Sequence, residues 1–374
     1  MYIYQDTYWP NFTWDKDVIS TKLVAVNKAS GFLAGRLSTI GFDGQIGAVA
    51  EIMSQDILTS SAIEGVLLNT DQVRSSVARR LGAPIPNKVP SSHHIDGIVE
   101  MMLDATTHCM APLTNERLFG WHNCLFPNGR SGCEVINVAK YRTTGMKVVS
   151  GTFGREKVHY VAPDAKEIPI MMDSFFKWFN DNHLTNNYLK SAIAHLWFVC
   201  IHPFDDGNGR IARAIADMAL SQVEGSNMRY FSMSRQINND KKSYYNILER
   251  TQNSGCDITD WLLWYLDCMI RAISEADKIL SNVLKKSIFW QNHSQVAITE
   301  RQRNVLNIYL DGYTGKLTVK NWAKLAKVSV DTASRDINDL MQKEILIPQK
   351  GQVRNVAYAI SVSPEQILTF EPEQ

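Results

Sequence analysis

The chain has 374 residues and lacks a dominant charge, because 39 Lys and Arg face 38 Asp and Glu for a net charge of +1. A nearly neutral protein has no overall field that draws it to nucleic acid or to an anionic membrane. Long apolar runs are also lacking. The strongest, AIAHLWFVCI from Ala192 to Ile201, is far shorter than the roughly 20 residues of a membrane-spanning helix, so we expect no membrane partner.

The six cysteines show no CxxC spacing, which disfavours a structural zinc site and a thioredoxin-like site. The first residues, MYIYQDTYWP, contain neither a basic nor an apolar stretch, so we expect no signal peptide. Scattered cysteines without a signal peptide are typical of reduced thiols, and we expect a cytoplasmic protein. Cys200 lies near His202 and is a candidate nucleophile, but its apolar neighbours favour a buried structural thiol.

Helical periodicity dominates the rest of the chain and predicts a mainly α protein. We expect an amino-terminal helical domain over 1–95, a second mostly helical domain over 96–287 and a third domain over 291–374. Three prolines and a glycine in 82–92 predict a linker or a long loop. The exception to the helices is 147–161, where two β-prone runs flank a glycine-containing turn and predict a hairpin.

The carboxy-terminal part predicts a winged helix: a helix, a helix-turn-helix and two short strands around KGQVRN. The second helix of the helix-turn-helix, VDTASRDINDLMQK, would enter a DNA major groove with Ser334 and Arg335 as candidate readers. Residues 291–360 hold ten Lys or Arg and six Asp or Glu, a balance of +4 that is weak for DNA. The same fold also serves as a protein–protein module, so DNA stays an open alternative.

Candidate functional side chains are concentrated in the stretch IHPFDDGNGRIAR, from Ile201 to Arg213. Pro203 ends one helix, and a new helix begins near Asn208. Glycines at 207 and 209 permit a tight turn between them. The free N–H groups and the dipole of such a helix N-terminus bind phosphate.

Side chains with complementary chemistry surround this turn. Arg210 and Arg213 lie on neighbouring parts of one helix face, within reach of a polyphosphate. An acid at the turn can hold Mg²⁺, which prefers oxygen ligands, and His202 can take a proton near neutral pH. Each feature alone is more often structural. Together within thirteen residues they predict a phosphoryl or nucleotidyl transfer site.

The stretch HPFDDGNGRIAR resembles the Fic family motif HPFx(D/E)GNGRxxR and matches it at every specified position. The resemblance implies an all-helical catalytic core that moves AMP from ATP to a Ser, Thr or Tyr hydroxyl of a target protein. The branch of the family that phosphorylates instead carries a lysine in place of a motif glycine, and this chain has Gly209 there.

Carried over by position, the resemblance makes His202 the general base, Asp206 the Mg²⁺ ligand and Phe204 the anchor of the loop. It assigns phosphate binding to Gly207, Asn208, Gly209, Arg210 and Arg213. Asp205 falls on the variable position and receives no role.

Three further segments resemble the family. The hairpin at 147–161 sits where the family has its flap, a strand that registers the target by β-augmentation, so Val158, His159 and Tyr160 are candidate target-binding residues. The segment KKSYYNILERTQ resembles the adenine-side segment and makes Tyr244 and Gln252 candidates for the base pocket. The start, MYIYQDTYWPNFTWD, resembles the domain that precedes many Fic cores.

An isolated SxxxE pattern, such as the one in SSAIEGVLL, usually marks only a helix with one exposed glutamate. Here, however, Ser60, Glu64 and Gly65 match the Fic inhibitory pattern (S/T)xxxE(G/N). The resemblance implies that Glu64 pairs with Arg213 and competes with the γ-phosphate of ATP. Three alternatives stay open: removal of AMP with Glu64 positioning a water, a role mainly as a DNA-binding regulator, and assembly as a homodimer.

Overall fold

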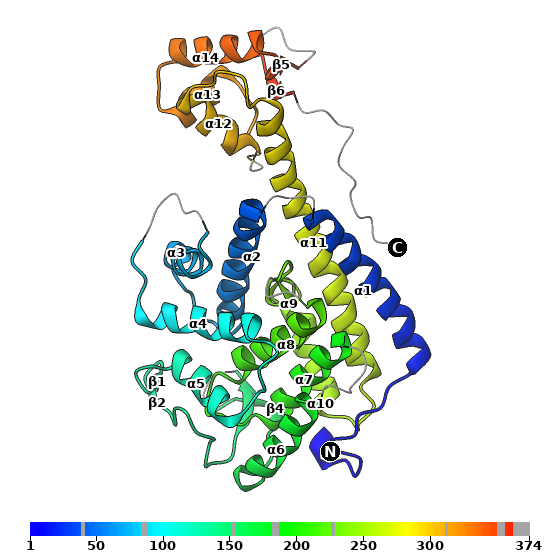
Figure 1. Ribbon diagram of the computed structural model, residues 1–374. Coiled ribbons are helices and arrows are strands. Elements are labelled where there is room, and N and C mark those ends of the chain that lie inside the picture. Colours follow the sequence, from blue (N-terminus) through cyan, green and yellow to red (C-terminus); the bar gives the residue numbers. More distant parts are fainter. Residues whose placement is uncertain are drawn as a thin grey trace. The chain divides into compact units, whose positions relative to one another are not determined.

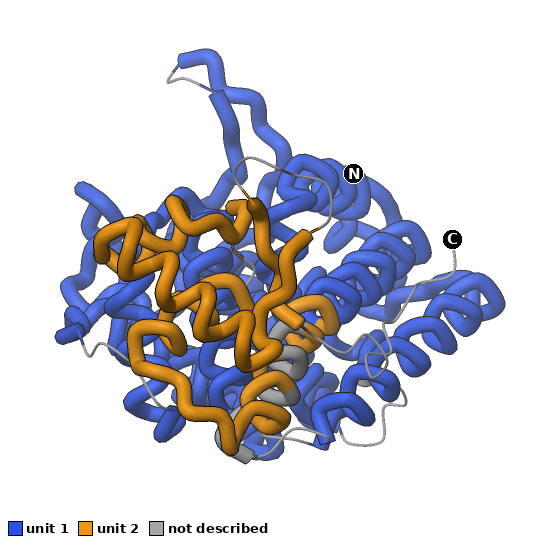
Figure 2. The backbone as a smooth tube through the Cα atoms, turned by 90° about the horizontal axis from the view of Figure 1, so that it is seen from above, with its two compact units in different colours: residues 1–276, 372–374 blue, residues 277–371 orange. Residues whose placement is uncertain are grey.

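The computed structural model divides the chain into two compact units, Met1–Ala276 and Asp277–Glu371 (Figure 2). The structure describes residues 1–38, 42–83, 89–151, 154–181, 187–225, 229–310, 313, 315–349 and 356–361. The boundary between the units falls inside one long helix. The division into domains at 95 and 287–291 therefore stays a prediction.

Helices make up most of the first unit, and two short hairpins and two single-turn 3₁₀ helices accompany them (Figure 1). The helices are α1 (Lys16–Leu37), α2 (Phe42–Ile63), α3 (Thr70–Leu81), α4 (His93–Thr107), α5 (Asn115–Leu125), α6 (Ile168–Phe179), α7 (Asn187–Ile201), α8 (Asn208–Glu224), α9 (Met233–Asn239), α10 (Lys241–Gln252) and α11 (Thr259–Asn292). The antiparallel hairpins are β1 (Arg130–Ser131) with β2 (Glu134–Val135), and β3 (Lys147–Ser150) with β4 (Lys157–Val161); the 3₁₀ helices are η1 (Ile3–Gln5) and η2 (Ala165–Glu167).

The antiparallel pair α7 and α8 forms the centre of this unit, and α8 also packs against α2, α4, α5 and α9. Both central helices are buried along nearly their whole length, which explains why their sequences are rich in alanine and isoleucine. Trp261 of α11 is fully buried, and its indole N–H donates to the carbonyl of Ala192 at 2.9 Å. The core thus holds the turn between α7 and α8 in place.

A buried polar cluster docks α2 on this core. Asp56 of α2 accepts hydrogen bonds from the Ser232 hydroxyl and from the backbone N–H of Ser234 at the start of α9. Asp217 of α8 lies beside it and forms an ion pair with Arg229 at 2.8 Å. Burial and the neighbouring Asp56 raise the pKa of Asp217, so the Asp217 carboxyl group binds a proton more readily than an exposed one. The arrangement sets which way the carboxyl end of α2 points.

The second unit contains α12 (Glu300–Leu310), α13 (Val319–Ala326), α14 (Val330–Gln342) and an antiparallel pair, β5 (Leu346–Pro348) and β6 (Tyr358–Ile360). Its core contains the fully buried Trp322, whose indole N–H donates to Asp336. Three helices followed by two strands are the elements, in this order, that the sequence predicts for a winged helix. The expected turn KGQVRN lies outside the described residues.

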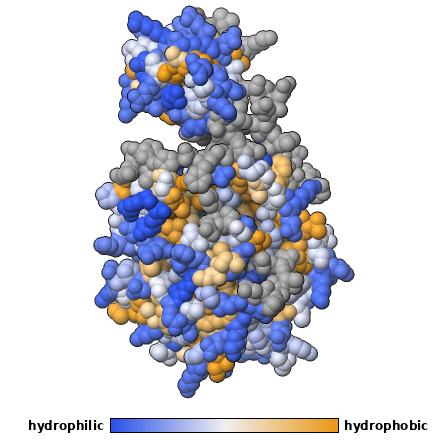
Figure 3. All heavy atoms as spheres, viewed as in Figure 1, coloured by the Kyte–Doolittle hydropathy of each residue, from blue (hydrophilic) through white to orange (hydrophobic). Residues whose placement is uncertain are grey.

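The prediction of a mainly helical protein is confirmed. Among the described residues, no helix is long and apolar enough to span a bilayer. Figure 3 shows hydrophilic side chains over much of the visible face, with apolar areas between them.

Candidate active site

The turn from α7 to α8 carries an unusual backbone at His202, which has φ of 52°. A non-glycine residue in this left-handed region costs on the order of 1–2 kcal/mol. The His202 N–H still closes the last turn of α7 on Phe198, at 3.0 Å, and Pro203 prevents the helix from continuing. The strain therefore sits on the residue predicted to be the base.

Two side chains inside the motif lock the turn. Phe204 is fully buried and stacks on the ring of His122 with centroids 4.3 Å apart. The Asn208 side chain bridges Phe204, because its Oδ1 accepts from the Phe204 N–H at 3.0 Å and its Nδ2 donates to the Phe204 carbonyl at 2.8 Å. The predicted anchor at Phe204 lies in the core, and Asn208 holds the loop with its side chain.

The N-terminus of α8 has no side-chain cap. Its N-cap is Gly207, with φ of 84°, where a side chain would be strained and would also collide with Phe126. Most helices satisfy their first N–H groups with a Ser, Thr, Asp or Asn at this position. Leaving the cap out keeps the N-terminal donors of α8 available for an anion.

Asp206 holds its carboxylate at the edge of this turn, about two-fifths exposed. It accepts from the Ser131 hydroxyl of β1 and from the Gly207 N–H at 2.6 Å, and it lies 3.7 Å from Arg210. No cluster of three metal-ligating side chains occurs among the described residues. One accessible carboxylate beside a phosphate site nevertheless suits Mg²⁺, which keeps several waters and completes its shell with substrate phosphates.

A cavity of about 230 Å³ adjoins Asp206, and its lining includes Arg130, Ser131, His94 and Arg210. Arg210 is buried over the ring of Phe126, at 4.9 Å, and its Nε has no hydrogen-bond partner among the described residues. Burial and Arg210 lower the pKa of His94. Two arginines, Arg130 and Arg210, thus line the cavity, and an anionic group would suit it although Asp206 lies 3.7 Å from Arg210.

The variable motif position, Asp205, has a structural role that the sequence did not indicate. Its Oδ2 accepts from the backbone N–H and the side-chain amide of Asn137, at 2.8 and 2.9 Å. His122 adds a second brace. Its Nδ1 accepts from the Ala139 N–H, so its Nε2 carries the proton and donates to the Asp206 carbonyl at 3.1 Å. Segment 137–139 thus supports the motif loop.

Burial keeps the His202 ring neutral, because a buried imidazole loses the hydration that favours its charged form. Burial lowers the pKa of its ring to about 4. The ring Nδ1 lies 3.2 Å from the Val199 carbonyl, which only accepts, so Nδ1 carries the proton in this contact. The lone pair then sits on Nε2, as a general base requires.

Arg213 is the most fully engaged cation of the site and is only 2% exposed. Its Nε donates to the Ser60 hydroxyl and one terminal nitrogen donates to the Ser60 carbonyl, both at 2.9 Å. The same nitrogen lies 2.7 Å from Glu64 Oε1. Burial alone would lower the pKa of Arg213, but the Glu64 carboxylate raises it above its usual value. The structure therefore places Glu64 against Arg213, the pair that the resemblance implies, and adds contacts from Ser60 to the same guanidinium.

Glu64 reaches this position because α2 ends just before it. Gly65 adopts φ of 78°, and the Gly65 and Val66 N–H groups bond back to Ala62 and Ser61, which closes the helix end. The Tyr245 hydroxyl and Lys241 donate to carbonyls of this last turn, at 3.3 and 3.5 Å. Two donors from α10 thus hold the carboxyl end of α2.

The Glu64 carboxylate lies directly over the motif turn. A Cβ placed on Gly209 would overlap Glu64 Oε1 and would approach Arg213 to 3.3 Å. A larger residue at this position would therefore have to displace the docked Glu64 carboxylate.

The flap residues differ in their availability. Val158 is 44% exposed, and Val149 opposite it is similarly exposed, so the hairpin offers apolar contacts. Tyr160 is fully buried and donates to the Cys200 carbonyl at 2.7 Å, so its side chain anchors the flap and cannot meet a target. His159 contacts Glu249 of α10 at 2.8 Å and ties β4 to that helix.

Tyr244 and Gln252 both lie buried on α10. The Tyr244 hydroxyl contacts His195 Nε2 at 2.9 Å, within the core. Their lining of a base pocket stays a prediction. Tyr245, next in the chain, is 41% exposed and contacts the end of α2, yet the sequence alone did not single it out.

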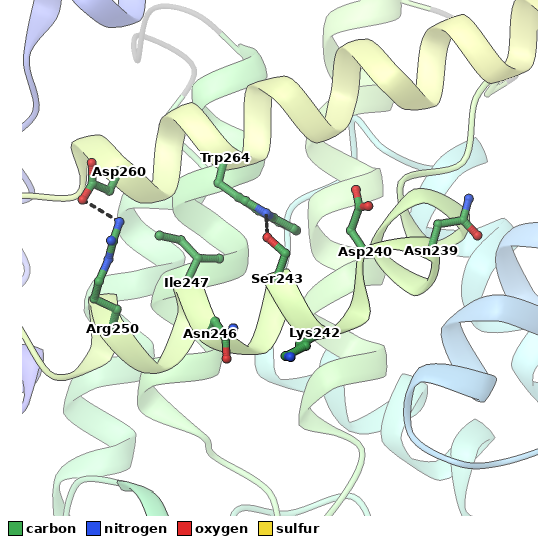
Figure 4. A pocket seen from close by; sticks show the side chains of 9 residues that line it. All are labelled: Asn239, Asp240, Lys242, Ser243, Asn246, Ile247, Arg250, Asp260 and Trp264. Atoms are coloured by element: carbon green, nitrogen blue, oxygen red, sulfur yellow. Dashed lines mark hydrogen bonds and ion pairs between the residues drawn. The ribbon is translucent and has the colours of Figure 1, made fainter.

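A groove of about 690 Å³ lies between α10 and the beginning of α11 (Figure 4). Its lining is mostly polar and includes Lys242, Asn246 and Trp264. Lys242 and Asn246 occupy a different face of α10 from Tyr244 and Gln252. We assign the groove no part in the motif chemistry.

Cys200 is fully buried, and burial raises the pKa of its thiol to about 12. A protonated, inaccessible thiol is no nucleophile. The structural interpretation of this cysteine is therefore correct.

Fold and site together define a mainly helical protein in which a helix N-terminus without a side-chain cap lies beside a neutral histidine. The chain carries a Fic/DOC domain, because residues 112–220 match the model of the Fic/DOC family. Residues 2–83 match a domain of unknown function, DUF4172.

Curated relatives agree with the family. Over 83 residues the chain is 32% identical to a protein adenylyltransferase Fic of Drosophila erecta and 35% identical to that of Drosophila virilis. These matches cover 20% of this chain, and only 16% and 17% of the two relatives. The chain thus matches less than a fifth of their length.

Solved structures show the same fold. A Fic family protein from Desulfovibrio desulfuricans G20 has a TM-score of 0.55 at 19% identity, over 95% of this chain and 98% of that one. A Fic domain containing signaling protein from Bacteroides thetaiotaomicron VPI-5482 has a TM-score of 0.51 at 21% identity, over 67% of this chain and 95% of that one.

Proposed function

We propose that this protein is a protein adenylyltransferase that moves AMP from ATP to a Ser, Thr or Tyr hydroxyl of a target protein. The observation that carries the proposal is the uncapped N-terminus of α8, flanked by the neutral ring of His202 and by two buried arginines. The Fic domain and the names of the curated relatives support it.

In this proposal His202 Nε2 takes the proton of the target hydroxyl as its oxygen attacks the α-phosphorus. The new P–O bond forms while the bond to pyrophosphate breaks. The backbone donors at the start of α8, with Arg210 and Arg213, bind the phosphates and offset the growing negative charge. Asp206, supported by Ser131, would hold Mg²⁺, which neutralises phosphate charge when bound.

Glu64 would keep the enzyme inactive by holding Arg213. One guanidinium cannot serve both the carboxylate and the γ-phosphate fully, so docking of Glu64 lowers productive ATP binding. The position of the carboxylate over Gly209 supports this competition.

A role mainly as a DNA-binding regulator has less support. Helix α14 carries one arginine, Arg335, against Asp331, Asp336 and Asp339. Phosphate contacts need clustered positive charge, and this helix is net negative.

The direct test of the proposed function uses ATP labelled at the α-phosphate, a Glu64→Gly variant and a cell lysate as the source of targets. We expect AMP on target hydroxyls, identified by mass spectrometry. Transfer of the γ-phosphate instead, or no label on any protein, would contradict the proposal.

His202→Ala is expected to abolish AMP transfer in the Glu64→Gly background. Loss of a general base costs roughly 10²–10⁴ in rate. ATP binding, measured by calorimetry, should stay close to the parent value because the N-terminus of α8 is untouched. Parent-like transfer by this variant would remove His202 from the chemistry.

The pH profile provides a second check on His202. Its pKa of about 4 lies below the usual value of about 6.5, so the neutral, active ring persists to lower pH. Transfer should therefore not fall between pH 8 and pH 6 through this group, and should decline only as the pH approaches about 4. Folding must be followed in parallel, because a buried neutral histidine destabilises the native state once the pH falls below the usual pKa. An acid limb centred near 6.5 with the fold intact would contradict a buried base.

Asp206→Ala is expected to lower transfer by about 10²-fold or more and to weaken its dependence on Mg²⁺. A readout besides activity is the binding of Mn²⁺ to the ATP complex, followed by paramagnetic relaxation. Asp205→Ala is the matched control, since that carboxylate braces Asn137. Unchanged Mg²⁺ dependence in Asp206→Ala would refute the metal assignment.

Glu64→Gly is expected to raise self-modification by roughly 5- to 150-fold, the usual range of such coupling. Glu64→Ala should behave alike, because Glu64 follows the last residue of α2 and helix propensity matters little there. Adding Arg213→Ala should return activity to a low level. Equal label on wild type and Glu64→Gly would refute inhibition, and less label on the variant would favour AMP removal with Glu64 positioning water.

A further inference from the structure

Arg142 lies on the segment before the flap, outside the motif, and is one of the largest fully buried side chains of the protein. All three side-chain hydrogen bonds that the structure describes for it go to backbone carbonyls. Burial lowers the pKa of its guanidinium, and Asp205 and Asp164 oppose this only through space. A buried cation without a directly bonded carboxylate is costly and calls for a reason other than stability.

The three carbonyls belong to three different parts of the site. Arg142 Nε donates to the His202 carbonyl at 2.8 Å, and its terminal nitrogens donate to the Thr144 and Pro163 carbonyls, both at 2.7 Å. Thr144 precedes β3 and Pro163 follows β4, so these two contacts hold both ends of the flap. The rigid fork of a guanidinium is what allows one side chain to bond in several fixed directions.

The backbone of Arg142 makes a fourth bond to the same place. Its N–H donates to the Pro203 carbonyl at 2.9 Å. Arg142 therefore binds both carbonyls of the His202–Pro203 pair. His202 is the residue with a left-handed φ of 52°, a conformation that persists only when the surroundings impose it.

We propose that Arg142 is a positioning residue that imposes the His202 backbone conformation and ties it to both ends of the flap. The base and the target segment registered by the flap then share one rigid frame. The hydroxyl arrives where Nε2 can take its proton, without Arg142 touching either substrate. This inference rests on the proposed function.

The cation also acts on the base electrostatically. Its charge contributes to the lowering of the His202 pKa, after the larger effect of burial. Together with the geometry, this keeps the ring neutral and correctly placed.

The test is carried out on the full chain with Glu64→Gly as the parent, using ATP and a target protein found with that parent. Arg142→Ala is expected to lower kcat by about 10²-fold, the size of effect that a misplacement of about 1 Å produces. The affinity for ATP, measured by calorimetry, should match that of the parent, because the contacts at the start of α8 remain. Added guanidinium ion should restore part of kcat by filling the vacated space.

Arg117→Ala is the matched control. Arg117 also donates to several backbone carbonyls, including those of Ala111 and His108, but it does so at the turn between α4 and α5. We expect it to lower thermal stability while the folded protein keeps the parent kcat and shows no response to guanidinium.

Arg142→Lys covers the case in which the alanine variant does not fold. Lysine keeps the charge but cannot bond three carbonyls in fixed directions, so kcat should still fall with ATP affinity intact. Parent-like kcat in a folded Arg142 variant, or an equal loss in Arg117→Ala, would overturn the inference. Failure of the Glu64→Gly parent to transfer AMP would instead refute the proposed function, so the two failures are distinguishable.

Discussion

The constraint on which the site depends is an uncapped helix end inside a folded core. Backbone N–H groups removed from water normally find partners within the protein, because leaving them without one costs free energy. At the start of α8 the cap position is Gly207, and the Asn208 side chain bonds to Phe204 instead of to the helix. The protein thus reserves these donors, and the packing of Phe204 and the brace from His122 keep the turn from collapsing.

Arg213 connects this reserved site with the amino-terminal helices. Its guanidinium holds the last turn of α2 through Ser60 and pairs with Glu64. Its other terminal nitrogen is buried without a hydrogen-bond partner among the described residues. In the proposed function this cation exchanges Glu64 for a phosphate, which would offer it more acceptor oxygens than the carboxylate does.

The flap and the base are connected in a comparable way from the other side. Tyr160 anchors the flap to the end of α7, and His159 ties it to α10. Arg142 donates hydrogen bonds to carbonyls at both ends of the flap and to the carbonyls of His202 and Pro203. These contacts are short and directional, so the hairpin cannot shift without moving the loop that carries His202. Val149 and Val158 of the hairpin stay exposed.

The sequence by itself determined the helical class, the turn at Gly207 and the candidate chemistry of its neighbours, because proline, glycine and helical periodicity act locally along the chain. The resemblance carried by HPFDDGNGRIAR also pointed to the Fic domain that the family comparison shows. Tertiary structure alone decided which side chains are available. Tyr160 and Tyr244 lie in the core, Asp205 is a brace, and Tyr245 and Arg142 act on segments distant in sequence. Burial and long-range hydrogen bonds depend on how the helices pack, and no pattern within a single segment contains that information.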